Sequence, residues 1–168
     1  MNSEFIKGNE IKLKVCSEDA TSRSKPIDFV VVGCRKCATT WLYELLLRHD
    51  EVCVSSLVKQ SGYFTKNFHK GTQWFYKLFD TCANDIVLGE VDPEIITSPN
   101  GIMNIKKFSP EAKIIAIFRN PAELFYSSYQ HSIRKGDLED SPEGAWLNTS
   151  QFREELQFGK MVNLIYKH

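Results

Sequence analysis

The amino-acid sequence predicts an α/β fold of three layers, in which a parallel β-sheet is flanked by helices. Short apolar runs of β-forming residues recur along the chain and are typical of strands covered on both faces. Segments with apolar residues at helical spacing follow these runs. Because strands that alternate with helices form parallel sheets with right-handed crossovers, this order of elements predicts the sheet. The predicted strands are residues 29–32, 52–54, 86–88 and 114–118.

Length and composition bound the organisation of the chain. It has 168 residues, of which 42% are hydrophobic, enough for one well-buried domain but too few for two of ordinary size. We therefore expect a single α/β domain over residues 26–168, after a polar arm over residues 1–25. The 21 lysines and arginines balance the 21 aspartates and glutamates. Without a basic excess, we expect no nucleic-acid partner.

The five cysteines are an odd number and form no dense disulfide framework. With no cleavable leader and no membrane-length apolar stretch, the sequence predicts a reduced, cytoplasmic protein without a membrane partner. Cys34 and Cys37 have the spacing of half a zinc site or of a redox pair, but no second pair with ligand spacing accompanies them. We interpret both as loop residues and expect no metal. The cysteines are Cys16, Cys34, Cys37, Cys53 and Cys82.

The corner between the first predicted strand and the following helix carries the strongest chemical signal. Gly33 allows a tight turn, Lys36 lies within it, and the helix begins with Ala38, Thr39 and Thr40. Free N–H groups and the positive dipole end of a helix attract anions. The pattern G-x-x-K-x-A-T-T therefore predicts a phosphate site, without the Gly-Lys-Ser/Thr entry of the usual nucleoside-triphosphate loop. Taken alone, the same pattern also fits a purely structural turn.

A second corner of this kind follows the predicted strand at residues 114–118. Arg119 follows the strand, Asn120 and Pro121 form a turn, and Ser127 lies about two turns into the aromatic-rich helix that follows. Doubly wound sheets bind ligands at the carboxyl ends of their strands, and the planar donors of arginine suit a phosphate. Two phosphate-type corners with the same polarity argue against a coincidental match.

At the first corner the chain resembles the sulfotransferases that use 3'-phosphoadenosine 5'-phosphosulfate (PAPS). Their 5'-phosphosulfate loop commonly reads G-x-x-K-x-G-T-T, and Lys36, Thr39 and Thr40 match it, while Ala38 replaces a glycine. The resemblance covers roughly residues 27–165 and is closer to the heparan-type and bacterial members. It implies a sulfotransferase fold similar to that of P-loop nucleoside triphosphatases.

The second corner resembles the 3'-phosphate motif of the same family. Arg119 and Ser127 match that motif, whereas Leu124 stands where the family often has a second arginine. The sequence Arg134-Lys135-Gly136 follows directly on this helix, and we interpret it as a solvated turn. The family's own Arg-Lys-Gly motif lies much nearer the C-terminus.

The resemblance implies roles for individual residues. Lys36 would be the catalytic cation that follows charge onto the leaving phosphate, and no metal takes part. PAPS would be the co-substrate, 3'-phosphoadenosine 5'-phosphate (PAP) the product, and a small molecule, glycan or peptide the acceptor. Because Cys37 lies beside Lys36 at a helix start, we expect a lowered thiol pKa and loss of nucleotide binding on alkylation. The residues implied in PAPS binding are Arg35, Lys36, Cys37, Ala38, Thr39, Thr40, Arg119 and Ser127.

The identity of the general base is left open by the resemblance. The segment KQSGYF is similar to a family segment in which a glutamate after the lysine is the base, but this chain has Gln60 there. We predict Glu90 as a second catalytic residue, because it lies at the crevice end of a predicted central strand. Other candidate bases are Asp92, His69 and His131, and candidate substrate contacts are Lys59, Gln60 and Asp92.

Two alternatives to a PAPS-dependent sulfotransferase stay open. A non-catalytic, regulatory protein that binds PAP or PAPS is favoured by Gln60, Ala38 and Leu124, and by a C-terminus that comes earlier than in most family domains. A P-loop kinase-like phosphotransferase is the weaker reading, because the chain lacks the Gly-Lys-Ser/Thr entry and a clear magnesium-binding aspartate. The acceptor and the oligomeric state are left undetermined.

Overall fold

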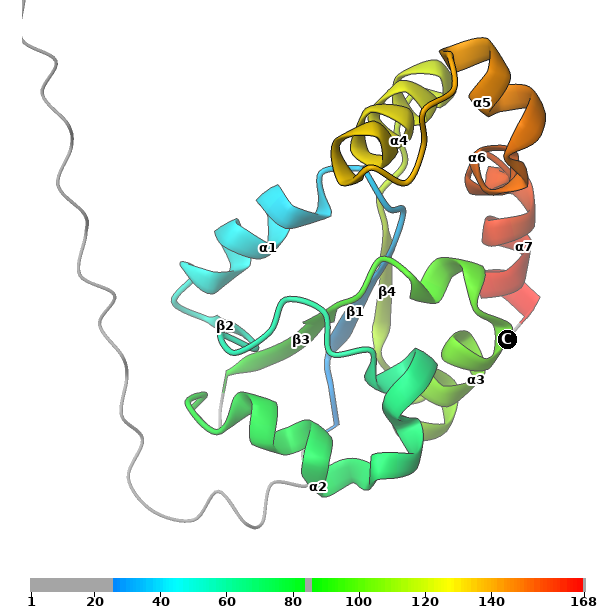
Figure 1. Cartoon of the computed structure of the whole chain (residues 1–168). Coiled ribbons are helices and arrows are strands. Elements are labelled where there is room, and N and C mark those ends of the chain that lie inside the picture. The colour runs from blue at the N-terminus through cyan, green and yellow to red at the C-terminus, as the bar shows by residue number, and fades with distance from the viewer. Residues whose placement is uncertain (1–25, 84–85, 168) are drawn as a thin grey trace, which may run out of the picture.

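The computed structural model describes residues 26–83 and 86–167, so the predicted N-terminal arm lies outside the described residues. Four strands form one sheet in the order β2-β3-β1-β4, and every neighbouring pair is parallel. This sheet with helices around it confirms the predicted α/β fold (Figure 1). The strands are β1 (Phe29–Gly33), β2 (Val52–Val54), β3 (Val87–Val91) and β4 (Lys113–Ala116).

Helices separate the strands, as the apolar spacing predicts. A π-helical turn at Tyr63–Asn67 and short 3-10 turns at Phe68–Lys70, Lys77–Phe79 and Ile95–Thr97 complete the connections. The α-helices are α1 (Thr39–Leu47), α2 (Gly71–Tyr76), α3 (Pro99–Phe108), α4 (Pro121–Lys135), α5 (Pro142–Asn148), α6 (Ser150–Glu155) and α7 (Phe158–Lys167).

Helix α4, which carries the second predicted phosphate corner, has defined ends. Asn120 Oδ1 accepts hydrogen bonds from the backbone N–H groups of Ala122 and Glu123, at 3.0 and 3.4 Å. Pro121 occupies the first helical position, where the missing N–H costs nothing. Gly136 ends the helix in the left-handed conformation with φ of 75°. The side chains of α4 are thus held at fixed positions along one axis.

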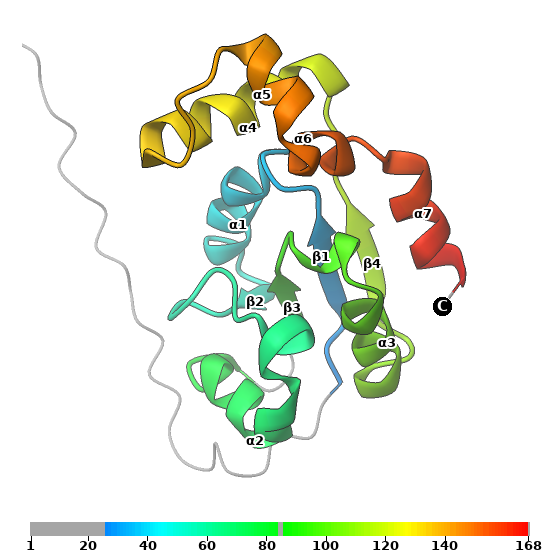
Figure 2. The same cartoon turned by 45° about the vertical axis from the view of Figure 1, so that its right-hand side comes forward.

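The two faces of the sheet pack against different helices. Val30 and Val32 of β1 belong to a large apolar cluster with side chains of α2, α3 and α7, whereas Phe29 and Val31 pack with Tyr43 of α1. This alternation is the period of two expected for a strand covered on both faces. Figures 1 and 2 accordingly show α1 on one side of the sheet and α3 and α7 on the other.

The carboxyl ends of β1 and β4 lie side by side. These strands are parallel neighbours, and pairing continues past the end of β4 through Ile117, whose N–H donates to Gly33 O and whose carbonyl accepts from Cys34 N, both at 2.7 Å. Helices α4, α5 and α6 lie at this end of the sheet (Figure 2). The two predicted phosphate corners therefore open toward the same end of the sheet.

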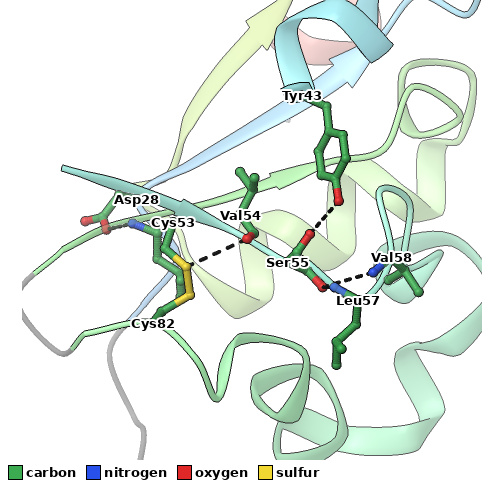
Figure 3. Close-up of a disulfide and its surroundings, with 9 residues drawn as sticks. Asp28, Tyr43, Cys53, Val54, Ser55, Leu57, Val58 and Cys82 are labelled. Carbon is green, nitrogen blue, oxygen red and sulfur yellow. Dashed lines mark hydrogen bonds between the residues drawn. A yellow bond between two sulfur atoms is a disulfide. The ribbon is translucent and has the colours of Figure 1, made fainter. Parts of the chain in front are cut away.

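The structure contradicts the expectation of a fully reduced set of cysteines. Cys53 in β2 and Cys82, 29 residues later, form a disulfide with their Cα atoms 5.9 Å apart (Figure 3). Such bonds are typical of secreted and luminal proteins, and the cytoplasmic setting stays a prediction. The number and spacing of the cysteines gave no sign of this pair. In the part of the chain that the structure describes, no helix is both long and apolar enough to cross a membrane.

Candidate functional site

The turn between β1 and α1 has a backbone that constrains its residues. Gly33 has φ of +152°, and a Cβ atom there would lie 2.6 Å from a methyl carbon of Ile96. Lys36 and Ala38 both have positive φ, of 59° and 60°. These are left-handed conformations, which favour glycine. The left-handed backbone at position 38 thus explains why the loop G-x-x-K-x-G-T-T has glycine at the position that Ala38 occupies in this chain.

A cavity of about 430 Å³ lies over this turn and the start of α1. Arg35, Lys36, Lys59 and Lys135 bring four cationic side chains to it, and Glu94 brings one carboxylate, which is paired with Lys66 outside the cavity at 2.8 Å. This surplus of positive charge favours an anionic ligand. The lining residues are Arg35, Lys36, Ala38, Thr39, Thr40, Lys59, Gln60, Pro93, Glu94, Ser127, His131 and Lys135.

Lys59 joins the loop after β2 to the start of α1. Its Nζ donates hydrogen bonds to Thr39 Oγ1 at 3.3 Å and to Thr40 Oγ1 at 2.7 Å. Burial lowers the pKa of Lys59, and repulsion by the nearby charge of Lys36 adds to this shift. The loop is also held by Tyr43, whose hydroxyl donates to Ser55 O at 2.7 Å (Figure 3). The predicted contacts Lys59 and Gln60 therefore both lie at the cavity.

A second cavity of about 300 Å³ lies along α4. Arg119 lines it, and Arg119 Nε donates to Glu123 Oε2 at 3.0 Å. Ser127 lines both cavities, so the two hollows meet at this side chain. The structure thus brings Ser127 together with the first corner and with Arg119. The residues lining the second cavity are Arg119, Glu123, Tyr126, Ser127, Gln130 and Arg134.

The cations around the first cavity affect one another. Burial lowers the pKa of Lys36, and repulsion by Arg134 and Arg35 adds to this shift. The positive charge of Lys36 is the first cause that lowers the pKa of His131, and Lys135 contributes. His131 is therefore held in its neutral form near pH 7, in which the ring can accept a proton.

Glu90 and Asp92 do not reach either cavity. Glu90 is 1% exposed, and its Oε1 accepts hydrogen bonds from Ser61 N at 3.1 Å and Ser61 Oγ at 2.6 Å. Burial raises the pKa of Glu90 to about 7. Asp92 is fully buried, its Oδ1 accepts from Glu94 N at 3.0 Å, and burial raises its pKa to about 6. The alternation of β3 turns both carboxyl groups inward, away from the crevice that the sequence predicts for them.

The side chain of Cys37 also lies away from the cavities. It is 2% exposed and packs in the apolar cluster beside Cys34, and both thiols are free. A hydrogen bond from the Cys34 thiol lowers the pKa of Cys37, in the predicted direction but chiefly through a neighbour that the sequence did not indicate. Burial of the thiol leaves little access for the predicted alkylation. Only the backbone of Cys37 lies in the turn that borders the first cavity.

Several residues at the cavities were not assigned to the site by the sequence. Lys135 and Arg134 were interpreted as a solvated turn, yet they end α4 and line the first and second cavity, respectively. His131, one of the weaker candidate bases, lines the first cavity, whereas His69 lines neither. Positions 127, 131, 134 and 135 share one helix face at spacings of four, seven and eight. Extending the motif along this face from Ser127 would have found them.

The described residues contain no group of three or more side chains that could hold a metal ion. The first cavity is lined by cationic side chains, by the hydroxyl groups of Thr39, Thr40 and Ser127, and by the start of α1. The chain is thus an α/β protein with a parallel sheet. Its cationic cavity lies at the carboxyl ends of the central strands, where such sheets bind ligands. The chain belongs to the sulfotransferase domain family, whose model matches residues 26–167.

Individual relatives agree with this family. The chain is 31% identical over 110 residues to the membrane-associated sulfotransferase kil1 of Dictyostelium discoideum, a match that covers 64% of this chain and 23% of that protein. It is 33% identical over 126 residues to the bifunctional heparan sulfate N-deacetylase/N-sulfotransferase 4 of Mus musculus, covering 68% of this chain and 14% of the relative. The matches thus span less than a quarter of the length of these relatives.

A solved structure shows the same fold. The sulfotransferase of Alicyclobacillus acidocaldarius superposes with a TM-score of 0.75 at 19% identity, and the match covers 85% of this chain and 68% of that one. At this identity the likeness concerns the fold alone. It agrees with the predicted sulfotransferase fold.

Proposed function

We propose that this chain transfers a sulfuryl group from PAPS to an acceptor hydroxyl or amine. The observation that carries the proposal is the place of Ser127, which borders both the cavity over the first corner and the cavity beside Arg119. A ligand with an anionic group at each end can thus occupy two adjoining hollows. Nucleoside phosphates with groups at both the 5' and the 3' position have this character.

The residues of the first corner suit the 5'-phosphosulfate end. Lys36, Thr39 and Thr40 line one cavity, and Thr39 and Thr40 begin α1, where helix N–H groups favour an anion. Arg35 adds a fourth donor-bearing side chain to the lining of this cavity. PAPS supplies the sulfuryl group, whose bond to the bridging oxygen of the phosphosulfate breaks as the bond to the acceptor forms. Lys36 neutralises the charge that grows at that oxygen.

The second corner suits the 3'-phosphate. Arg119 offers planar donors and Ser127 offers a hydroxyl donor in the same cavity. Adenosine 5'-phosphosulfate lacks the group that these two residues would hold. We therefore expect the site to prefer nucleotides that carry a 3'-phosphate.

His131 is the general base that the geometry favours. It borders the cavity that holds Lys36, and the positive charge of Lys36 keeps its pKa low, so the neutral ring can take the acceptor proton. Glu90, the base expected from the sequence, is buried behind Ser61 and borders neither cavity. Lys59 and Gln60 line the first cavity and remain proposed substrate contacts, whereas Asp92 is buried and lines neither cavity.

The names of the relatives indicate which acceptors to test first. One of them is named as a heparan sulfate N-sulfotransferase, so glycan amines are the first acceptors to test, followed by glycan hydroxyls, peptides and small phenols. The four cations at the first cavity also suit acceptors that carry negative charge.

Two measurements test the proposal. Calorimetric titration with PAP should show binding that is unchanged by EDTA and tighter than binding of Mg-ATP. Transfer of radiolabelled sulfate from PAPS to the acceptor panel should then be detected with the wild type and lost, by about a hundredfold or more, with Lys36→Ala. Absence of PAP binding by the wild type, or full transfer by Lys36→Ala, would refute the assignment.

A second candidate function is a non-catalytic PAP-binding protein. It is favoured by Gln60, an amide that borders the cavity and is unable to accept the acceptor proton. This candidate predicts PAP binding equal to that of an enzyme, but no labelled product with any acceptor. The variant Gln60→Glu, which restores a carboxylate, separates the enzyme from the non-catalytic binder. An enzyme would show sulfate transfer both as the wild type and as Gln60→Glu.

A further inference from the structure

The second cavity contains a cation that the proposed function leaves without a role. Arg134 lies in the last turn of α4 and lines this cavity together with Arg119 and Ser127. Ser127 and Arg134 are seven residues apart, which places them on one face of the helix, two turns from each other. Helical side chains lean toward the helix N-terminus, so the Arg134 side chain extends back toward Gln130 and Ser127. The cavity is thus bordered by a guanidinium at each end.

The two arginines differ in how they are neutralised. Arg119 Nε is 3.0 Å from Glu123 Oε2, and Glu123 is the one carboxylate among the residues that line this cavity. Among residues 26–83 and 86–167, Arg134 forms no ion pair. The Arg119–Glu123 pair is close to neutral as a unit. The net positive charge of the cavity therefore comes from Arg134.

A phosphate monoester carries close to two negative charges at neutral pH. A single arginine that already shares a carboxylate matches this charge poorly, whereas two guanidinium groups and a hydroxyl match it well. Arg134 is also close enough to the first cavity that its charge is the second largest cause of the lowered Lys36 pKa. Its field therefore extends over both hollows.

We infer that Arg134 is the second guanidinium that holds the terminal 3'-phosphate of the nucleotide, and that it sets the preference of this site for nucleotides with that group. The inference rests on the proposed function, because it assigns one residue within the proposed nucleotide site. In this arrangement Arg119 and Arg134 approach the phosphate from opposite ends of the cavity, and Ser127 donates from the side that adjoins the first cavity.

The test compares two nucleotides on matched variants. PAP carries both phosphates, and 5'-AMP lacks the 3'-phosphate, so the ratio of their dissociation constants isolates the contribution of that group. Arg134→Gln removes the charge and keeps most of the length of the side chain. Arg48→Gln makes the same change in net charge at the exposed end of α1, away from the residues that line either cavity. Thermal unfolding of each variant checks that the fold is retained.

We expect Arg134→Gln to weaken PAP binding about tenfold or more and 5'-AMP binding by a clearly smaller factor, since the loss of the field affects both nucleotides but a hydrogen-bonded charge is lost only for PAP. Arg48→Gln should leave the ratio unchanged, and Arg134→Lys should restore part of the preference. Equal weakening of both nucleotides, or an unchanged ratio, would overturn the assignment of Arg134 while the proposed function stands. Failure of the wild type to bind PAP would overturn both.

Discussion

The Nζ atom of Lys59 lies 2.7 Å from the Oγ1 atom of Thr40, so the loop after β2 is tied to the first turn of α1. This contact joins a residue from the weakest part of the sequence resemblance to a residue from its strongest part. It also places a partly buried ammonium group over the helix start, where the proposed 5'-phosphosulfate would bind. The cavity is therefore built by three segments rather than by the two corners alone.

Replacing Lys59 tests this third contribution. Lys59→Met keeps the length of the side chain but removes its charge and donors, and we expect PAP affinity to fall about tenfold, because a charged hydrogen bond is worth roughly 1.5–3 kcal/mol. Calorimetric titration measures the change. Lys77→Met is the matched control, since Lys77 is exposed and borders neither cavity. Equal affinity of wild type and Lys59→Met would show that Lys59 is only structural.

Ala38 gives a prediction on stability. Its φ of 60° is left-handed, which costs a residue with a Cβ about 1–2 kcal/mol. Glycine has more backbone freedom than alanine in the unfolded chain, and this offsets part of the gain from removing the strain. Ala38→Gly should therefore stabilise the protein by about 0.5–1 kcal/mol in urea unfolding. Ala122→Gly, at an exposed helical position of α4, should instead destabilise it by a similar amount. A loss of stability in Ala38→Gly would contradict the assigned backbone conformation.

His131 gives a prediction on the rate and its pH dependence. If this side chain is the base, His131→Asn should lower kcat by about a hundredfold. Because Lys36 holds the His131 pKa below its usual value of 6.5, wild-type kcat should fall only as the pH drops below that value. The variant should lose this acidic limb. His69→Asn serves as the control, because His69 is exposed and borders neither cavity. Retention of both rate and acidic limb by His131→Asn would exclude this role.

Glu90 gives a prediction on stability against pH. Its pKa rises from 4.5 in the unfolded chain to about 7 in the fold, so the native state binds the extra proton between these values. Stability from this group is present below pH 4.5 and is lost as the pH rises toward 7, by about 3 kcal/mol. Glu90→Gln keeps an oxygen for Ser61 and does not titrate, so its stability should be less dependent on pH over this range.

The control for this experiment is Glu139→Gln, at an exposed position. Its urea unfolding between pH 4.5 and 7.5 should follow that of the wild type. Parallel pH profiles of wild type and Glu90→Gln would mean that Glu90 is charged in the native protein. Sulfate transfer by Glu90→Gln should stay within a fewfold of wild type, because the carboxyl group borders neither cavity.

The disulfide gives a prediction on covalent stabilisation. Cys53 and Cys82 close a loop of 29 residues, which in the chain-entropy account stabilises the fold by about 3–4 kcal/mol. A variant with both cysteines changed to serine should lose about this much in urea unfolding. Dithiothreitol should lower the stability of the wild type to that of the variant and leave the variant unchanged. Equal stability of oxidised and reduced wild type would show that the bond does not constrain the fold.

Much of the fold could be predicted from local sequence, because the strands are short apolar runs and the corners have recognisable residues. The predicted strand at residues 52–54 coincides with β2, and the adjacency of β1 and β4 follows from the polarity of two similar corners. Parallel strands that each end in a phosphate-type turn have few ways to be arranged. The sequence therefore indicated the end of the sheet at which the cavities lie, and it named three of the four cations that line the first cavity, Arg35, Lys36 and Lys59.

The errors have two causes, the direction of side chains and the contacts between distant segments, and local sequence specifies neither. Glu90 lies near the carboxyl end of a strand, but the pleat turns it inward, and a shift of one position would have reversed this. Lys135 was interpreted as part of a solvated turn, because helix ends are usually exposed. The direction of α4 instead places Lys135 at the first cavity. The pairing of Cys53 with Cys82 depends on tertiary contacts between segments, which spacing alone does not encode.

The cross-link between β2 and Cys82 affects how the purified protein should be handled (Figure 3). The residues between its two ends include the loop that carries Lys59 and Gln60. A sample kept in the thiol reductants usual for cysteine-containing enzymes is a different chemical species from one kept under air. Activities recorded for two batches are comparable only after mass spectrometry has assigned the thiol content of each.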